Sequence, residues 1–257
     1  PAISGLGFLA SNYVYQIGPL CRMHMTLVMF ETLAIAFIAD FEDPRYGTRN
    51  LTLGLVMLLC AGYTKQTAVF TVAAALSYVF LRDQKRAIIS GLGLAAIAGF
   101  IFWLINIATD GAWWVNIIQA NVNAFDYRQT IFLFKQWLSL HTLFVILAAG
   151  YFVYELFWDR LSAYSLWFFF ALGVGALSGK WGAGFGYFTT AVAAACLVSG
   201  LALGKVWEKV KGSELFVSAL RVPALPLLAV IIPLLYLCQA PRMLHLPTSG
   251  PIFGTVS

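Results

Sequence analysis

Residues 87–108 of the chain read AIISGLGLAAIAGFIFWLINIA, an apolar run without a single charged side chain. A helix needs about 20 predominantly apolar residues to cross the hydrocarbon core of a bilayer. This run has that length, and the basic residues Arg82, Lys85 and Arg86 stand shortly before it. The segment therefore predicts a transmembrane helix with a charged end.

The composition of the whole chain points the same way. Hydrophobic residues make up 61% of the 257 residues and charged residues only 11%, whereas a soluble domain carries about 25% charged residues. This small number of polar side chains cannot cover the surface of a globule in water. Membrane lipids are therefore the expected surroundings. The net charge of +5 comes in short clusters between apolar runs. Since no nucleic-acid-binding signature accompanies it, we expect no nucleic-acid partner.

The apolar runs repeat along the chain and predict an all-α, polytopic transmembrane helical bundle of about eight spans. We treat residues 1–257 as one transmembrane domain and expect it to be a fragment of a longer chain. The second and third runs are short, and they are either two short tilted helices or a broken pair that meets at Lys65. The eight runs are 24–40, 50–64, 66–81, 87–108, 138–157, 162–179, 185–204 and 222–240.

The Lys and Arg residues divide unevenly between alternate loops. Loops 41–49, 82–86, 158–161 and 205–221 hold ten of them, and the intervening segments hold six. Because cytoplasmic loops are enriched in Lys and Arg, the first set is predicted on the cytoplasmic side. Both ends of this multi-pass chain are then extracytoplasmic, which agrees with an even number of spans.

The long loop between the fourth and fifth spans, residues 109–137, has a helical pattern of its own. The pattern predicts an amphipathic helix lying in the extracytoplasmic interface. This helix is either a plain anchor at the membrane surface or a lid over a cavity at that face. Its apolar residues, with asparagines between them, are Trp114, Ile117, Ile118, Val122 and Phe125.

Polar groups within apolar segments are the informative residues of a membrane protein. Glu31 lies midway along the first span, where it either hydrogen-bonds a neighbouring helix or faces a functional cavity. Lys65 lies between two apolar runs, and Lys180 lies in the glycine-rich segment 178–184. Each lysine belongs either to an ordinary interface or turn, or to a site that holds a lipid phosphate. Their predicted position opposite the main basic clusters favours the phosphate hypothesis.

Catalytic and metal-binding motifs are scarce. The sequence has no G-x-S-x-G, Walker, H-E-x-x-H or G-x-G-x-x-G motif, and its four cysteines have no metal-ligand spacing. We therefore predict no metal site from the residues of this chain. Asp110 and Asp126 are the carboxylates of the predicted extracytoplasmic side, and each is either a general base by position or an ordinary solvated or capping residue. Asp126 is the candidate that we select for the catalytic role.

Four segments, taken together, resemble a known family. They are residues 62–68 (GYTKQTA), 179–188 (GKWGAGFGYF), 18–25 (GPLCRMHM) and, more weakly, 247–251 (PTSGP). In order and spacing they are similar to the GT-C superfamily of polytopic membrane glycosyltransferases. The most similar branch is the bacterial one related to protein mannosyltransferases and aminoarabinose transferases.

The resemblance implies transfer of a sugar from a lipid-phosphate-linked donor on the extracytoplasmic face of a bacterial inner or plasma membrane. In this family an acidic motif of the first extracytoplasmic loop activates the acceptor or holds a divalent metal ion. That motif would lie before Pro1, so the catalytic group and the metal ligands are expected outside this sequence. The substrate-binding residues that the resemblance implies are Lys65, Lys180, Arg22, Arg128 and Tyr187.

Two departures from the family pattern keep several alternatives open. The family often has Asp where His24 stands, and an amide and a carboxylate where this chain has Gly186 and Thr189. The chain is thus either a glycosyltransferase or a catalytically degenerate relative that serves as a structural subunit of a larger membrane complex. A transporter, with Glu31 as its functional carboxylate, is the third alternative.

Overall fold

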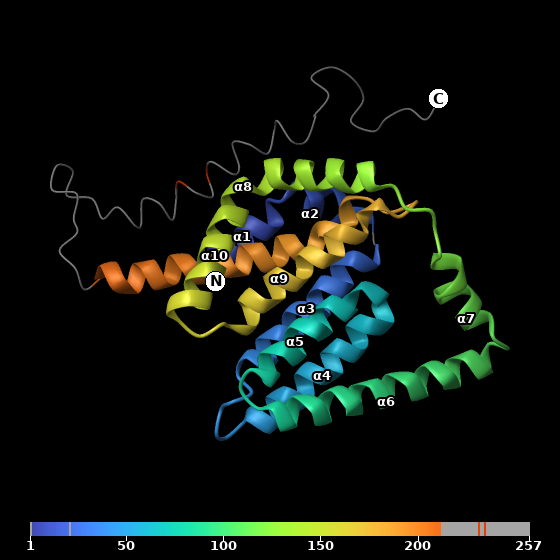
Figure 1. Cartoon of the computed structure of the whole chain (residues 1–257). Coiled ribbons are helices and arrows are strands. Elements are labelled where there is room, and N and C mark those ends of the chain that lie inside the picture. Colours follow the sequence, from blue (N-terminus) through green and yellow to red (C-terminus); the bar gives the residue numbers. More distant parts are fainter. Residues whose placement is uncertain (1, 21, 212–230, 232–233, 235–257) are drawn as a thin grey trace, which may run out of the picture.

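The computed structural model describes residues 2–20, 22–211, 231 and 234, and within these residues the chain is helical without strands (Figure 1). The prediction of an all-α fold is confirmed. The eighth apolar run, 222–240, lies almost entirely outside the described residues, as does the 247–251 segment.

Each of the first seven apolar runs coincides with a helix or with part of one. The second and third runs form separate helices that meet at Lys65, because α4 ends at Thr64 and a short 3₁₀ turn leads into α5. In chain order the α-helices are α1 (Ala2–Leu9), α2 (Asn12–Ile17), α3 (Met23–Ala39), α4 (Gly47–Thr64), α5 (Val69–Phe80), α6 (Gln84–Ala108), α7 (Ala112–Ile117), α8 (Tyr127–Trp158), α9 (Ala163–Ala176) and α10 (Thr189–Lys211). The 3₁₀ turns are η1 (Gly18–Leu20), η2 (Gln66–Ala68), η3 (Gln119–Asn121), η4 (Leu177–Gly179) and η5 (Phe185–Phe188).

Three helical segments of the described chain are long and apolar enough to cross a membrane: Gln84–Ala108, Tyr127–Trp158 and Phe185–Glu208. A fourth is added if Asn12–Leu20 and Met23–Ala39, which are bent by 116°, count as one span. This agrees with a membrane protein. The remaining apolar helices are shorter, since α5 has 12 residues and α9 has 14.

The helices differ in how much of their surface the protein itself covers. α10 lies at the centre, where it contacts α1, α3, α8 and α9. α6 runs along one side of the bundle (Figure 1), and its apolar side chains face outward. Ile97, Phe100 and Trp103, for example, are each more than half exposed. A continuous apolar surface of this kind suits lipid rather than water.

Glu31 ties the centre of the bundle together. Its carboxylate is fully buried and accepts hydrogen bonds from the hydroxyls of Thr71 on α5 and Thr190 on α10, each at 2.7 Å. The indole of Trp167 on α9 donates in turn to the Thr71 oxygen at 3.0 Å. Of the two roles expected for Glu31, the structure therefore has the hydrogen bond to neighbouring helices.

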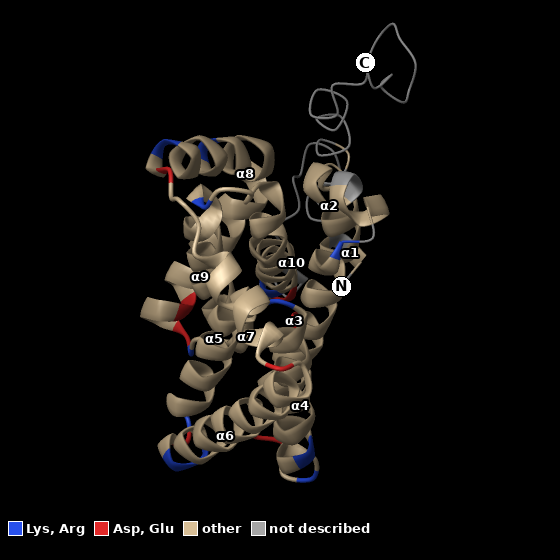
Figure 2. Ribbon diagram, turned by 90° about the vertical axis from the view of Figure 1, so that its right-hand side faces the viewer, with Lys and Arg blue, Asp and Glu red and all other residues tan. Residues whose placement is uncertain are grey.

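Three of the loops predicted on the cytoplasmic side lie together at one end of the bundle. Arg82 binds Glu42 at 3.2 Å and donates to the backbone of the α8–α9 loop, while Arg160 lies 3.8 Å from the same Glu42 carboxylate. Lys205 pairs with Asp159 close by. Figure 2 shows basic clusters at the ends of α4 and α6. These contacts bring three of the predicted cytoplasmic loops together, and the side of the membrane that they face stays a prediction.

The predicted helix of the loop 109–137 is shorter than expected. α7 covers only six residues, and the chain after η3 is extended because its backbone pairs with the Lys180 segment. The Asp126 amide donates to the Gly179 carbonyl at 2.8 Å, and the Trp181 amide donates to the Ala124 carbonyl at 2.9 Å. The helical spacing of Val122 and Phe125 was therefore misleading, because this pairing outweighs the local pattern. α8 then begins at Tyr127 and contains a non-helical residue at His141.

The contact between α3 and α4 gives a test of this packing. A Cβ atom added to Gly54 would lie 2.4 Å from the Ile38 side chain and 3.1 Å from the Ala34 carbonyl oxygen. We expect Gly54→Ala to lower the free energy of unfolding by about 1–3 kcal/mol, because the two helices must move apart. Thermal unfolding in detergent micelles measures the change.

Gly93 on α6 supplies the matched control, because a Cβ there meets nothing within 4 Å. Gly93→Ala should leave the stability unchanged or raise it slightly, since Ala favours helix over Gly. Equal destabilisation by both substitutions would contradict the proposed close packing.

Candidate functional site

A cavity of about 1350 Å³ opens where three helix junctions meet: α2 with α3, α4 with α5, and α9 with α10. α6 and α7 complete its walls. Among the described residues, no Asp or Glu lines it. Its basic side chains are Arg22, His24, Lys65 and Lys180, and its other polar side chains include Gln66, Thr67, Asn121 and Tyr187.

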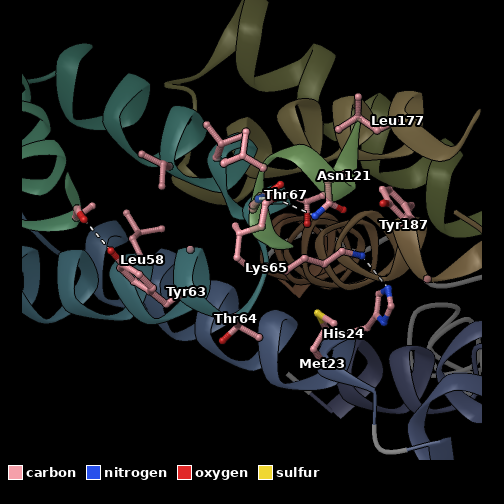
Figure 3. A pocket seen from close by; sticks show the side chains of 18 of the residues that line it. Met23, His24, Leu58, Tyr63, Thr64, Lys65, Thr67, Asn121, Leu177 and Tyr187 are labelled. Carbon is pink, nitrogen blue, oxygen red and sulfur yellow. Dashed lines mark hydrogen bonds between the residues drawn. The ribbon is translucent and has the colours of Figure 1, made fainter. Parts of the chain in front are cut away.

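Lys65 points into this cavity because the helix breaks at its position. Its backbone is extended, with φ −160° and ψ 135°, directly after α4. The ammonium of Lys65 is 2.8 Å from the Nε2 atom of His24 and 4.0 Å from the centre of the Tyr187 ring. Figure 3 shows the Lys65 side chain extended toward His24, with Tyr187 nearby. Residues from three distant parts of the chain thus meet at one amine.

Both partners of Lys65 are neutral groups. An imidazole that accepts a hydrogen bond from an ammonium carries no charge of its own, and the Tyr187 ring attracts the cation through its π face. No carboxylate within the described residues pairs with Lys65. Burial lowers the pKa of the Lys65 ammonium to about 8, and the Glu31 carboxylate acts in the opposite direction. Below that pH the Lys65 ammonium is positively charged, and no carboxylate of the described cavity lining compensates it.

Lys180 lines the same cavity from the α9–α10 junction. Its ammonium donates to the carbonyl oxygen of Asn121 at 3.1 Å, so it reaches the segment that follows α7. The Gln129 side chain holds the backbone of this junction by donating to the Ser178 carbonyl at 2.7 Å. Gly179 allows the approach, since a Cβ there would lie 2.5 Å from the Asp126 carbonyl oxygen. The glycine-rich segment is thus a tight junction that also directs a cation into the cavity.

Gly186 plays a similar part for His24. A Cβ atom on Gly186 would lie 2.4 Å from the His24 Nε2 atom, the same atom that contacts Lys65. Only a glycine leaves room for the imidazole at this place. His24 at the start of α3 and Gly186 in the turn before α10 therefore pack closely together beside the Lys65 ammonium.

The residues predicted to bind substrate are only partly gathered here. Arg22, Lys65, Lys180 and Tyr187 all line the cavity, whereas Arg128 does not. Asp126, the candidate base, is exposed and does not line it either. Its carboxylate accepts a hydrogen bond from the Arg128 backbone amide at 2.8 Å and so caps α8.

Sequence reasoning missed the contact between His24 and Lys65, which are 41 positions apart. It also gave no site role to Gln66, whose amide donates to the Ile117 carbonyl and attaches α7 to the cavity, or to Thr67. Thr67 is 7% exposed, and within the described structure its hydroxyl has no hydrogen-bond partner. Gly186 was the local signal that something approaches this backbone closely.

The rest of the cavity wall is apolar. It is built from one face each of α4, α5 and α6, with Leu58, Val72, Leu76, Leu94, Ala98 and Phe102 among its residues. A pocket with cations at one end and an apolar wall beside them fits a ligand with an anionic head and a hydrocarbon tail.

No protein-family model, curated protein or solved structure matches this chain. The class that fold and site define is an all-α protein with membrane-spanning helices and a cationic, carboxylate-free cavity in its described part.

The lowered pKa of Lys65 is testable directly. An ordinary lysine has a pKa of about 10.4, whereas Lys65 should lose its proton near pH 8 because burial disfavours the charged form. We expect acetic anhydride to modify Lys65 with a half-maximal rate near pH 8, measured by mass spectrometry of the peptide. The modification at this position should disappear in Lys65→Arg. A rate that rises only near pH 10 would contradict the buried position of the amine.

Proposed function

We propose that this chain is a GT-C-type membrane glycosyltransferase, or a close derivative of one, that binds a lipid-phosphate-linked sugar donor in the cavity. The observation that carries the proposal is the charge of the site. Arg22, Lys65 and Lys180 line one cavity in which no described carboxylate neutralises them. A phosphate group supplies the missing negative charge, and Lys and Arg are its usual ligands.

The lipid part of the proposed ligand fits the apolar wall. Leu76 and Gly91 line both this cavity and a second groove of about 740 Å³ between α5, α6 and α9. Because α6 is apolar on its outer side, a prenyl chain that leaves the cavity along these helices meets hydrocarbon. A soluble anion such as inorganic phosphate would gain no binding energy from this apolar wall, because it has no hydrocarbon to bury there.

In the membrane, the proposed arrangement has about eight spans, with the cavity on the extracytoplasmic side. The basic end held by Glu42 is then cytoplasmic, in keeping with the enrichment of Lys and Arg in cytoplasmic loops. We place the interfacial segment at α7, which carries Trp114 and Ile117 of the predicted pattern. Both chain ends are extracytoplasmic, and the host is a bacterial inner or plasma membrane.

In the proposed reaction, an acceptor group attacks the anomeric carbon of the sugar, and the bond from that carbon to the phosphate oxygen breaks. The electron pair of this bond stays on the lipid phosphate, whose growing charge Lys65, Lys180 and Arg22 stabilise. The acceptor proton must pass to a base. Asp126 is the weak candidate within this chain, since its carboxylate caps α8 outside the cavity.

A non-catalytic structural subunit of a larger membrane complex is the second candidate. The absence of Asp and Glu from the described cavity lining favours it, because binding needs the cations alone whereas transfer also needs a base. Such a subunit would still bind the lipid phosphate. Transfer of a radiolabelled sugar from a prenyl-phosphate-linked donor separates the two candidates, because the subunit gives none.

Binding of farnesyl phosphate tests the proposed ligand class. We expect the purified chain in detergent to bind farnesyl phosphate more tightly than farnesol or inorganic phosphate, as measured by isothermal titration calorimetry. Lys65→Ala and Lys180→Ala should each weaken binding of farnesyl phosphate about tenfold, because each removes a cation from a partly desolvated site. Binding to farnesol should not change.

Lys85→Ala is the matched control, since Lys85 is exposed at the start of α6, away from the cavity lining. It should bind farnesyl phosphate as the unmodified chain does. Equal affinity for farnesyl phosphate and farnesol, or equal losses in all three variants, would overturn the proposal.

A further inference from the structure

The most buried cation of the cavity has an unusual partner. The Lys65 ammonium is held at 2.8 Å by a neutral imidazole, that of His24, rather than by a carboxylate. A carboxylate would hold the amine as firmly, but it would cancel the charge of Lys65. The choice of partner therefore decides how much positive charge remains for a ligand.

The surroundings of His24 are fitted to this contact. Gly186 leaves the space that the Nε2 atom occupies, because a Cβ there would come within 2.4 Å. Thr189, three residues further on, donates its hydroxyl to the Gly186 carbonyl at 2.8 Å and so fixes that backbone. The imidazole is thus placed by the backbone of another helix rather than by a loose side-chain contact.

The other charged and titratable groups around the pair leave its charge unbalanced. Arg22, from the turn before α3, adds a second positive charge, and Tyr187 offers only its neutral ring to Lys65. Glu31 lies outside the cavity lining, bonded to two Thr hydroxyls in the core, and its charge acts on Lys65 from there, so it offsets part of one charge only. Lys180 adds a third cation from the α9–α10 junction.

We propose that His24 is a positioning residue that sets the charge selectivity of the cavity. It fixes the Lys65 ammonium without neutralising it, so that the site favours a phosphate headgroup over an uncharged or zwitterionic one. This inference rests on the proposed function, because it specifies how the same site recognises its ligand. The GT-C family often has Asp at this position, but the described part of this chain has no metal-ligand cluster that would balance a carboxylate there. An anionic side chain at position 24 of this chain would therefore offset one of three positive charges and pair with the most buried of them.

Substitutions at position 24 separate charge from shape. His24→Asn keeps a neutral acceptor for Lys65 and should bind farnesyl phosphate within about threefold of the unmodified chain. His24→Asp keeps an acceptor but adds a negative charge, and should weaken farnesyl phosphate binding at least tenfold. Both variants should bind farnesol alike, because the apolar wall is untouched.

The reactivity of Lys65 gives a readout that a purely structural role would not move. An aspartate beside the ammonium favours its charged form, so the half-maximal pH of acetylation should rise above the value of about 8 in His24→Asp. Melting temperatures of both variants close to that of the unmodified chain establish that they fold.

Gly186→Ala keeps the test decisive if His24→Asp fails to fold. It changes no charge but displaces the imidazole, so we expect weaker binding of farnesyl phosphate. Adding His24→Asn, whose side chain is shorter, should restore part of the affinity.

Three results would overturn the inference while leaving the proposed function intact. They are unchanged binding of farnesyl phosphate by His24→Asp, equal losses in His24→Asp and His24→Asn, and no effect of Gly186→Ala. If the unmodified chain itself does not distinguish farnesyl phosphate from farnesol, the proposed function fails first.

Discussion

The hydrogen bonds of the buried Glu31 carboxylate fix the helices that carry the cavity. Glu31 lies on α3, two turns after His24, and its two oxygens bind Thr71 of α5 and Thr190 of α10. These helices begin beside the cavity, close in sequence to His24, Lys65 and Gly186. A buried carboxylate left without partners is costly. Any movement of α5 or α10 away from α3 that broke these hydrogen bonds would therefore be unfavourable. The relative positions of the three helix starts, and hence of the cationic groups, follow from them.

Periodicity and composition were enough to predict the helices but not their meeting points. Each of the first seven apolar runs forms a helix or part of one, because apolar surface and backbone hydrogen bonds leave a membrane chain little else to form. Lys65 was also predictable as a break, since its charge interrupts two apolar runs. The extended segment around Phe125 was not, because its conformation depends on pairing with Lys180, which is 55 positions away in the sequence. Local pattern carries no information about such a partner.

The candidate site shows the same division. Lys65 and Lys180 stand out in the sequence as cations among apolar residues, and the structure brings both to one cavity. His24 does not stand out, because a histidine near a helix start has many ordinary roles. Only the space left by Gly186 reveals that its ring belongs beside Lys65. The individual cations of the site were therefore predictable from the sequence. The pairing of Lys65 with the neutral His24, which leaves its charge in place, was not.

The shortness of α5 and α9 has a consequence for the lipids around them. An α-helix rises about 1.5 Å per residue, so the 12 residues of α5 extend over only about 18 Å, well below the roughly 30 Å of a bilayer core. Lipids next to a short hydrophobic segment respond by local thinning. In the proposed membrane arrangement, headgroups beside α5 would therefore lie deeper than elsewhere. Under the proposed function, a lipid-phosphate carrier in this thinned region would present its phosphate at nearly the depth of Lys65 and would need little movement along the membrane normal to bind.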